Sequence, residues 1–303
     1  MSKYFGRYFH LEVKTAGGET LIYEPPMEVR FAVDNYYQHS VGLARITIYG
    51  VSSRAREMIQ IRNNNEHHFG IVTLQAGYEE QFGNIFFGRI NSVQVFKDGV
   101  NTCIRLNCSS VSSEWDNATY QTWGDNTPYL EVIRDVASLL GAPVEFVGDF
   151  SDLPVLPFGA NGGGKLCRLW MDILARNFGF SWLHTSNRTV ITRKGGSRSW
   201  SKHELSANSG MEGAPRWYAD RLEVDVKMNH LYQPSDRIDI TSSFWTLNFS
   251  GAYYTDYQDL YGYQMRTGTF SLLNTSHEGS YWGDTWKTTL GCIWYKEADN
   301  GGS

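Results

Sequence analysis

The first and last thirds of the chain alternate apolar and polar residues with a period of two. From Met27 to Val33 every second residue is apolar, whereas Glu28 and Arg30 lie on the opposite side. Because side chains of a strand point alternately to opposite faces, this pattern predicts strands with one buried face. Strands of this kind are predicted at 11–14, 20–23, 27–33, 44–49, 69–76, 85–90, 222–228, 237–240, 269–273 and 286–293.

The middle third has a helical period instead. "NTPYLEVIRDVASLLGAP" predicts a helix with Thr127 as N-cap, Pro128 in its first turn and Gly141 at its end. "KLCRLWMDILARNFG" predicts a second helix that ends at Gly179. Their expected apolar stripes are Leu130, Ile133, Val136, Ala137 and Leu140, and Leu166, Leu169, Trp170, Ile173 and Leu174. A third short helix is expected at 53–61, a hairpin at 180–192 and a linker at 194–201.

Composition and charge exclude several functions. The 303 residues carry a net charge of −5 without a basic face, which argues against sequence-specific DNA binding. No stretch is long enough to be a membrane span or a secretory signal. Cys103, Cys108, Cys167 and Cys292 form no metal-ligand spacing, so we expect buried free thiols. Aromatic residues make up 15% of the chain, which suits a β-rich protein with large interfaces.

The stretch "GYEEQFGNIFFGRI" combines a polar segment with a dense apolar run. We expect Gly77 and Gly83 to frame a loop. Gly88 lies among large β-formers, where a glycine usually marks a bulge, a bend or a close backbone approach.

One segment is similar to a nucleotide-binding loop. Gly159 to Lys165 matches G-x-x-x-x-G-K, and a predicted helix follows. Leu166, however, stands where the loop requires Ser or Thr to hold magnesium, and the preceding segment contains two prolines. A flexible loop that leads into a helix is the better interpretation.

Other candidate sites have simpler explanations. His67 and His68 lack further ligands at metal spacing. His184, His203, His230 and His277 stand singly, and the acidic pairs Glu79–Glu80 and Asp256–Asp259 are not placed across a cleft. Asn117 matches a glycosylation site, which has no meaning without a secretory signal. The aromatic residues of the last third favour interfaces over glycan binding: Tyr253, Tyr254, Tyr257, Tyr261, Tyr263, Trp282, Trp286 and Trp294. No catalytic, cofactor-binding or metal-binding residues are therefore assigned.

The order of several short motifs resembles phage tail and baseplate hub proteins of the late control protein D type, which are related to the base of type VI secretion spikes. The similar segments of the first third are the strands within 27–48, "AGY" at 76–78 and "IFFGRI" at 85–90. Those of the last third are "GAPRW", "LYQPSDRIDI", Gly268–Phe270, His277–Gly279 and Trp286–Thr288.

The resemblance implies a mainly β fold with an α/β insertion. The expected domains are a first tube-like β-barrel at 1–112, an α/β insertion and linker at 113–205, and a second tube-like β-barrel at 206–303. It also implies a homotrimeric hub that adapts a six-fold tail tube to a three-fold spike. Other baseplate proteins would be partners, and DNA would pass through the lumen without specific binding.

The expected location is the virion tail, after assembly in the host cytoplasm. Because the chain stops soon after the second barrel, any needle or peptidoglycan-cleaving domain is expected on another polypeptide. The alternative function is a carbohydrate-binding or receptor-binding β protein of the virion.

Overall fold

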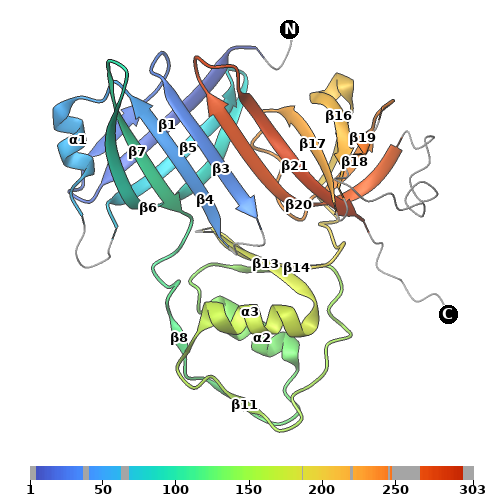
Figure 1. The fold of residues 1–303 in the computed structure, drawn as a ribbon. Helices are drawn as coiled ribbons and strands as arrows, with labels where there is room; N and C mark the ends of the chain where they lie inside the picture. Colours follow the sequence, from blue (N-terminus) through green and yellow to red (C-terminus); the bar gives the residue numbers. More distant parts are fainter. Residues whose placement is uncertain are drawn as a thin grey trace.

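One large sheet dominates the structure, a computed structural model that describes residues 5–36, 41–62, 68–185, 187–218, 221–244, 246–247 and 267–295 (Figure 1). The sheet has 14 strands and is mostly antiparallel. It forms two lobes side by side, and a smaller mixed unit, the insert, lies below them (Figure 1). The mainly β fold with an α/β insertion is therefore confirmed.

The first lobe contains the alternating segments of the first third. Its register places Phe9, Leu11 and Val13 of β1 in the same core as Val72 and Leu74 of β5. Helix α1 is capped by Ser52, whose hydroxyl accepts a hydrogen bond from the Ala55 amide. The elements are β1 (Arg7–Thr15), β2 (Thr20–Tyr23), β3 (Val29–Tyr36), β4 (Gly42–Tyr49), α1 (Ser53–Ile59), β5 (Gly70–Tyr78), β6 (Gln81–Asp98) and β7 (Asn101–Ser109).

The second lobe has a core of its own, built on Leu222, Val224 and Phe270. The tyrosine-rich part of 250–266 lies outside the described residues. The elements are β15 (Lys202–Leu205), β16 (Met211–Trp217), β17 (Leu222–Lys227), β18 (Arg237–Thr241), β19 (Thr246–Leu247), β20 (Thr267–Ser280) and β21 (Trp286–Trp294), with a short 3₁₀ turn at Ala207–Ser209.

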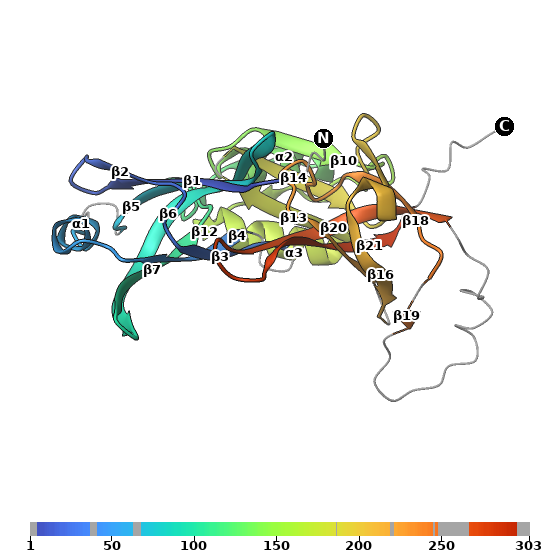
Figure 2. The same cartoon turned by 90° about the horizontal axis from the view of Figure 1, so that it is seen from above.

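The long strand β20 lies between β3 and β21 and joins the two lobes (Figure 2). Residues 267–271 pair with β18, whereas residues 274–280 pair with β3 of the first lobe. Trp286 of β21 reinforces the junction, because its ring packs edge-on against Phe31 and its indole N–H donates to the Gly77 carbonyl at 2.9 Å. We expected two separate barrels. Among the described residues neither lobe closes into a barrel. In the first lobe β3 pairs with β20 and not with β2, and in the second no pairing within the described ranges joins the outer strands β15 and β19.

The insert packs two helices against a three-stranded sheet, and its core is separate from those of the lobes. Helix α2 begins one residue later than expected: Pro128 is the N-cap, and Thr127 donates to the Gly124 carbonyl instead. The elements are β8 (Ala118–Thr119), β9 (Thr122–Trp123), α2 (Tyr129–Ser138), β10 (Val144–Val147), β11 (Ala160–Asn161), β12 (Lys165–Leu166), α3 (Cys167–Phe178), β13 (Phe180–Thr185) and β14 (Arg188–Arg193).

The expected stripe of α3 was partly wrong. The helix buries Cys167, Met171 and Leu174, whereas Leu169 is exposed. The stretch 194–201 is also more than a linker, because it contains the buried Arg198.

The stretch 77–90, "GYEEQFGNIFFGRI", forms the turn and second strand of a hairpin and not the expected loop. Gly77 pairs with Phe82 across the turn at Glu79–Glu80, and Gly83 lies within β6. Two bulges, at Ile85 and Asn91, flank Gly88. A Cβ at Gly88 would lie 2.3 Å from the Ser109 carbonyl oxygen, so the glycine permits a close approach of β6 and β7 at a bend.

We predict that Gly88→Val destabilises the protein by about 1–3 kcal/mol or prevents soluble expression, because the added atoms overlap backbone. Gly124→Val is the matched control, since no atom lies within 4 Å of the Cβ that it adds. Thermal unfolding of both variants measures the effect. An unchanged melting temperature for Gly88→Val would contradict this explanation.

Candidate functional site: the polar junction of three cores

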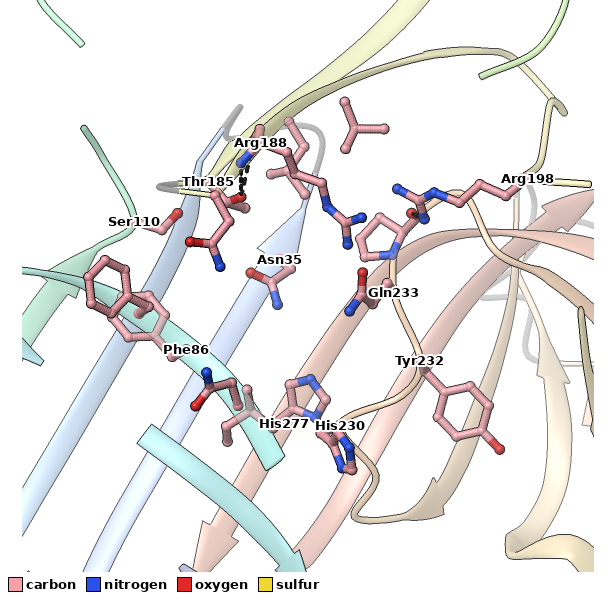
Figure 3. Close-up of a pocket in the computed structure, with 17 residues that line it drawn as sticks. Asn35, Phe86, Ser110, Thr185, Arg188, Arg198, His230, Tyr232, Gln233 and His277 are labelled. Carbon is pink, nitrogen blue, oxygen red and sulfur yellow. Dashed lines mark hydrogen bonds between the residues drawn. The ribbon is translucent and has the colours of Figure 1, made fainter. Parts of the chain in front are cut away.

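A polar cavity lies where the two lobes and the insert meet, and we name this region the junction. Its volume is about 430 Å³. The side chains labelled in Figure 3 come from all three units and surround one space. They are Asn35, Phe86 and Ser110 of the first lobe, Thr185 and Arg188 of the insert, Arg198 of the connecting segment, and His230, Tyr232, Gln233 and His277 of the second lobe.

Arg198 connects the insert to the second lobe. Its side chain is 1% exposed. The guanidinium makes two hydrogen bonds to the Glu145 carboxylate of β10, and a third nitrogen donates to Asp236 at 3.0 Å and to the Pro234 carbonyl at 2.7 Å. Burial opposes the charge and these carboxylates favour it, and the net effect raises the pKa of Arg198. Such a two-pronged pair fixes orientation as well as contact.

Further polar contacts extend this connection. The second carboxylate oxygen of Asp236 accepts a hydrogen bond from the backbone N–H of Gln233 at 2.9 Å and lies 3.0 Å from Nε2 of His203. Thr192 of β14 and Ser235 share a hydrogen bond of 2.6 Å between their hydroxyls. The insert is thus held to the second lobe by buried polar groups that satisfy one another.

His184 holds the insert to the first lobe. Its backbone bridges to Val41, and its carbonyl accepts from the Ser110 hydroxyl at 3.3 Å. Nδ1 lies 2.9 Å from the Thr189 hydroxyl and Nε2 lies 3.2 Å from the Ser112 hydroxyl. Burial lowers the pKa of His184 to about 4, so the ring is neutral at pH 7.

Two further histidines line the cavity from the second lobe. His277 is buried, with Nδ1 2.9 Å from the Thr288 hydroxyl. Burial and the neighbouring His230 lower the pKa of His277 to about 4. Burial also lowers the pKa of His230, whose Nδ1 has no hydrogen-bond partner among the described residues. The His230 ring of the second lobe packs against Gly83 of the first lobe. A glycine is required there, because a Cβ at position 83 would lie 2.5 Å from the ring.

The side chains of the junction are suited to holding the two lobes and the insert in fixed positions. Within the described ranges, no group of three or more His, Cys, Asp or Glu side chains could hold a metal ion. Both nitrogens of His184 are engaged, and Arg198 is neutralised by carboxylates. The arrangement can fix three packed units relative to one another. Sequence reasoning missed Arg198, which lies in a Gly/Ser-rich stretch. It also assigned Gly83 to a loop and missed its contact with His230, which is remote in sequence.

The nucleotide-loop candidate has a different geometry. Ala160–Asn161 pairs antiparallel with β9, and Lys165–Leu166 pairs antiparallel with β8. Lys165 places its ammonium over the Trp170 ring, 5.1 Å from the centroid.

The remaining candidates are dispersed. His68 is buried and accepts a hydrogen bond from the Gly70 amide, whereas His67, Asp256 and Asp259 lie outside the described residues. Asn117 donates to the Leu139 carbonyl. All four cysteines are buried free thiols, as expected.

The aromatic candidates separate into three groups. The five tyrosines lie outside the described residues. Trp286 is buried between the lobes of one chain, and Trp294 stacks on Phe270 in the second core at 4.6 Å. Trp282 is 68% exposed. Of these three tryptophans, Trp282 is the one that is largely exposed, whereas Trp294 is half-buried.

Comparisons with solved structures identify the architecture. A tail protein from Neisseria meningitidis superimposes with a TM-score of 0.57 at 12% identity, covering 95% of this chain and 97% of its own. The 43 kDa tail protein of prophage MuSo2 from Shewanella oneidensis gives 0.58 at 9% identity, covering 95% and 98%. This chain has the fold of phage tail proteins.

A third solved structure extends the similarity. It is an E. coli component of the type VI secretion system, described as structurally similar to T4 bacteriophage tail proteins gp27 and gp5. Its TM-score is 0.52 at 10% identity, covering 90% of this chain and 75% of that one. No protein-family model and no curated protein matches the sequence. The resemblance to phage tail proteins and to a type VI secretion component is therefore confirmed at the level of fold.

We predict that Arg198→Met lowers the free energy of unfolding by about 3–5 kcal/mol, because it leaves two carboxylates without their buried partner. Lys202→Met is the control: it removes a pair to Asp239 in which both side chains are partly exposed, and should cost less than about 1 kcal/mol. Denaturant unfolding measures both. Equal losses would show that Arg198 contributes no more than a surface charge.

We also predict a loss of stability in mild acid. The folded-state pKa values of His184 and His277, about 4, lie below the unfolded value of about 6.5. Below pH 6.5 the unfolded chain therefore binds protons that the folded chain does not, and stability falls by up to about 1.4 kcal/mol per pH unit for each histidine until about pH 4. His277→Gln should reduce stability at pH 7.5 and flatten this slope. If neither His277→Gln nor His184→Gln changes the slope of stability against pH, groups other than these histidines cause the loss in acid.

Proposed function

We propose that the protein is a structural component of a phage tail, a hub that adapts a six-fold tail tube to a three-fold spike. The observation that carries the proposal is the fold, which matches two phage tail proteins over 95% of the chain. On this proposal the protein is not an enzyme, resides in the virion tail and is assembled in the host cytoplasm.

The arrangement of lobes supports the symmetry argument. Each lobe is a curved part of one sheet with its own core, so three chains would supply six similar units to a ring. We propose the corresponding domain boundaries 1–112, 113–205 and 206–303, on the basis of three separate cores. Some packing crosses the boundaries, since Met228 and Trp286 belong to the first core.

Exposed apolar residues at both ends support two partners. At the end of the insert farthest from the sheet lies β11 (Figure 1), and Phe158, two residues before it, is 94% exposed. At the opposite edge, the turn between β20 and β21 presents Trp282. Exposed aromatic residues are frequent binding anchors. We propose that a tail tube protein and a spike or tail-tip protein bind these two ends, with further baseplate proteins around them.

The net charge of −5 is consistent with DNA that passes a lumen without specific binding. In the described part of the chain, no helix has the length and apolar character needed to span a membrane. The alternative proposal is a carbohydrate-binding or receptor-binding protein of the virion, and the exposed Trp282 is an observation that favours it.

We predict that a reconstruction of the end of the tail tube will show three copies of this chain in one pseudo-six-fold ring. The interfaces should be large, because permanent assemblies commonly bury more than about 2,000 Å². The reconstruction is decisive because trimerisation can require the tube or spike as a template. Six copies or one copy per ring would contradict the proposal. Glycan binding by a monomer would favour the alternative.

A further inference from the structure

The turn between β20 and β21 holds an exposed tryptophan in a fixed position. The Trp282 amide donates to a Glu28 carboxylate oxygen at 2.8 Å, and its indole N–H donates to the Pro26 carbonyl at 2.9 Å. Its ring also contacts Tyr281 edge-on, with centroids 5.0 Å apart. Backbone and side chain are thus both anchored while 68% of the residue remains exposed.

Arg7 of β1 fixes the same turn from the other side. Its guanidinium donates to the carbonyls of Ser280, Tyr281, Gly283 and Asp284. The Ser280 hydroxyl bonds to Glu28 at 2.8 Å and accepts from the Gly283 amide at 3.1 Å. Ordering an exposed aromatic side chain before binding reduces the entropy lost when a partner binds. The turn is therefore pre-organised.

A cleft opens beside Trp282. It is also lined by Gly283 of the same turn and by residues at strand ends and turns of the first lobe, which are Glu28, Arg30, Tyr49, Gly50, Asp98 and Asn101. Arg30 lies over the Tyr49 ring and pairs with Glu28 at 2.9 Å. The Tyr49 hydroxyl donates to Asp98 at 3.1 Å. Asp98 is exposed, and Arg30 attracts its carboxylate without forming an ion pair with it within 4 Å among the described residues.

We propose that this cleft receives a basic side chain, arginine or lysine, from a loop of a neighbouring virion protein. The exposed Trp282 ring and the exposed Asp98 carboxylate in one cleft are complementary to a cation. Val100, which is 98% exposed in the adjacent β6–β7 turn, would cover the apolar part of the same loop. Another copy of this chain is a poorer partner, because its net charge is −5. That the partner is a virion protein rests on the proposed function as a component of a phage tail.

A direct test uses the purified chain with ¹⁵N-labelled tryptophan and two capped tripeptides, acetyl-Ala-Arg-Ala-amide and its citrulline analogue. Citrulline has the shape of arginine without the charge. The Trp282 indole signal is assigned from its absence in Trp282→Phe. We expect the arginine peptide to shift this signal with a dissociation constant of about 10–100 mM, because isolated cation–π contacts and exposed ion pairs are weak. The citrulline peptide should not shift it.

Asp98→Asn should abolish the shift in a folded protein, as judged by the other tryptophan signals. The absence of a shift, equal shifts with both peptides, or an unchanged shift in Asp98→Asn would overturn the proposal. Glycan mixtures that shift the signal when the arginine peptide does not would assign the cleft to carbohydrate.

Tail assembly identifies the occupant. We expect Trp282→Ala and Asp98→Lys to block attachment of one neighbouring protein, while Phe158→Ala, at the opposite end, blocks a different one. An Asp98→Lys variant that assembles normally overturns the docking proposal, even if the peptide binds. If the wild-type chain does not enter tails at all, the proposed function fails, whereas the peptide result stands.

Discussion

The pairing of β20 with β3 is the constraint on which the rest of the architecture depends. One strand uses its first half to complete the second lobe and its second half to continue the sheet of the first. Backbone hydrogen bonds fix such a contact to the residue, because a slip by one position would turn every side chain to the wrong face. Two lobes that could have been joined by a flexible linker therefore share one continuous sheet.

The insert is fixed by a different kind of interaction. Its hydrophobic core is separate from those of the lobes, and its contacts with them are largely polar: Arg198 with Glu145 and Asp236, and His184 with Ser110. A buried ion pair adds little net stability compared with apolar packing, but it tolerates only one geometry. The junction therefore contributes orientation more than stability.

The sequence predicted most elements, because alternation and helical stripes are local signals. The strands β1 to β5 and the end of α3 at Gly179 follow from such signals. The α3 stripe was displaced because Leu169 is apolar yet faces solvent, so hydrophobicity alone did not identify the buried face. The continuous sheet, the Gly83–His230 contact and the Arg198 pairs join residues far apart in sequence, and no local pattern specifies them.

The same distinction explains how the fold is shared with tail proteins at 9–12% identity. A period-two pattern and a ladder of backbone hydrogen bonds are satisfied by many apolar and polar residues, so the sheet places few demands on individual side chains. Arg198, the buried histidines and the turn that presents Trp282 depend on particular functional groups at particular distances. In such a fold the backbone defines the common architecture. The polar side chains at its junction and edges are then free to specify how one chain orients its insert and which groups its turns present.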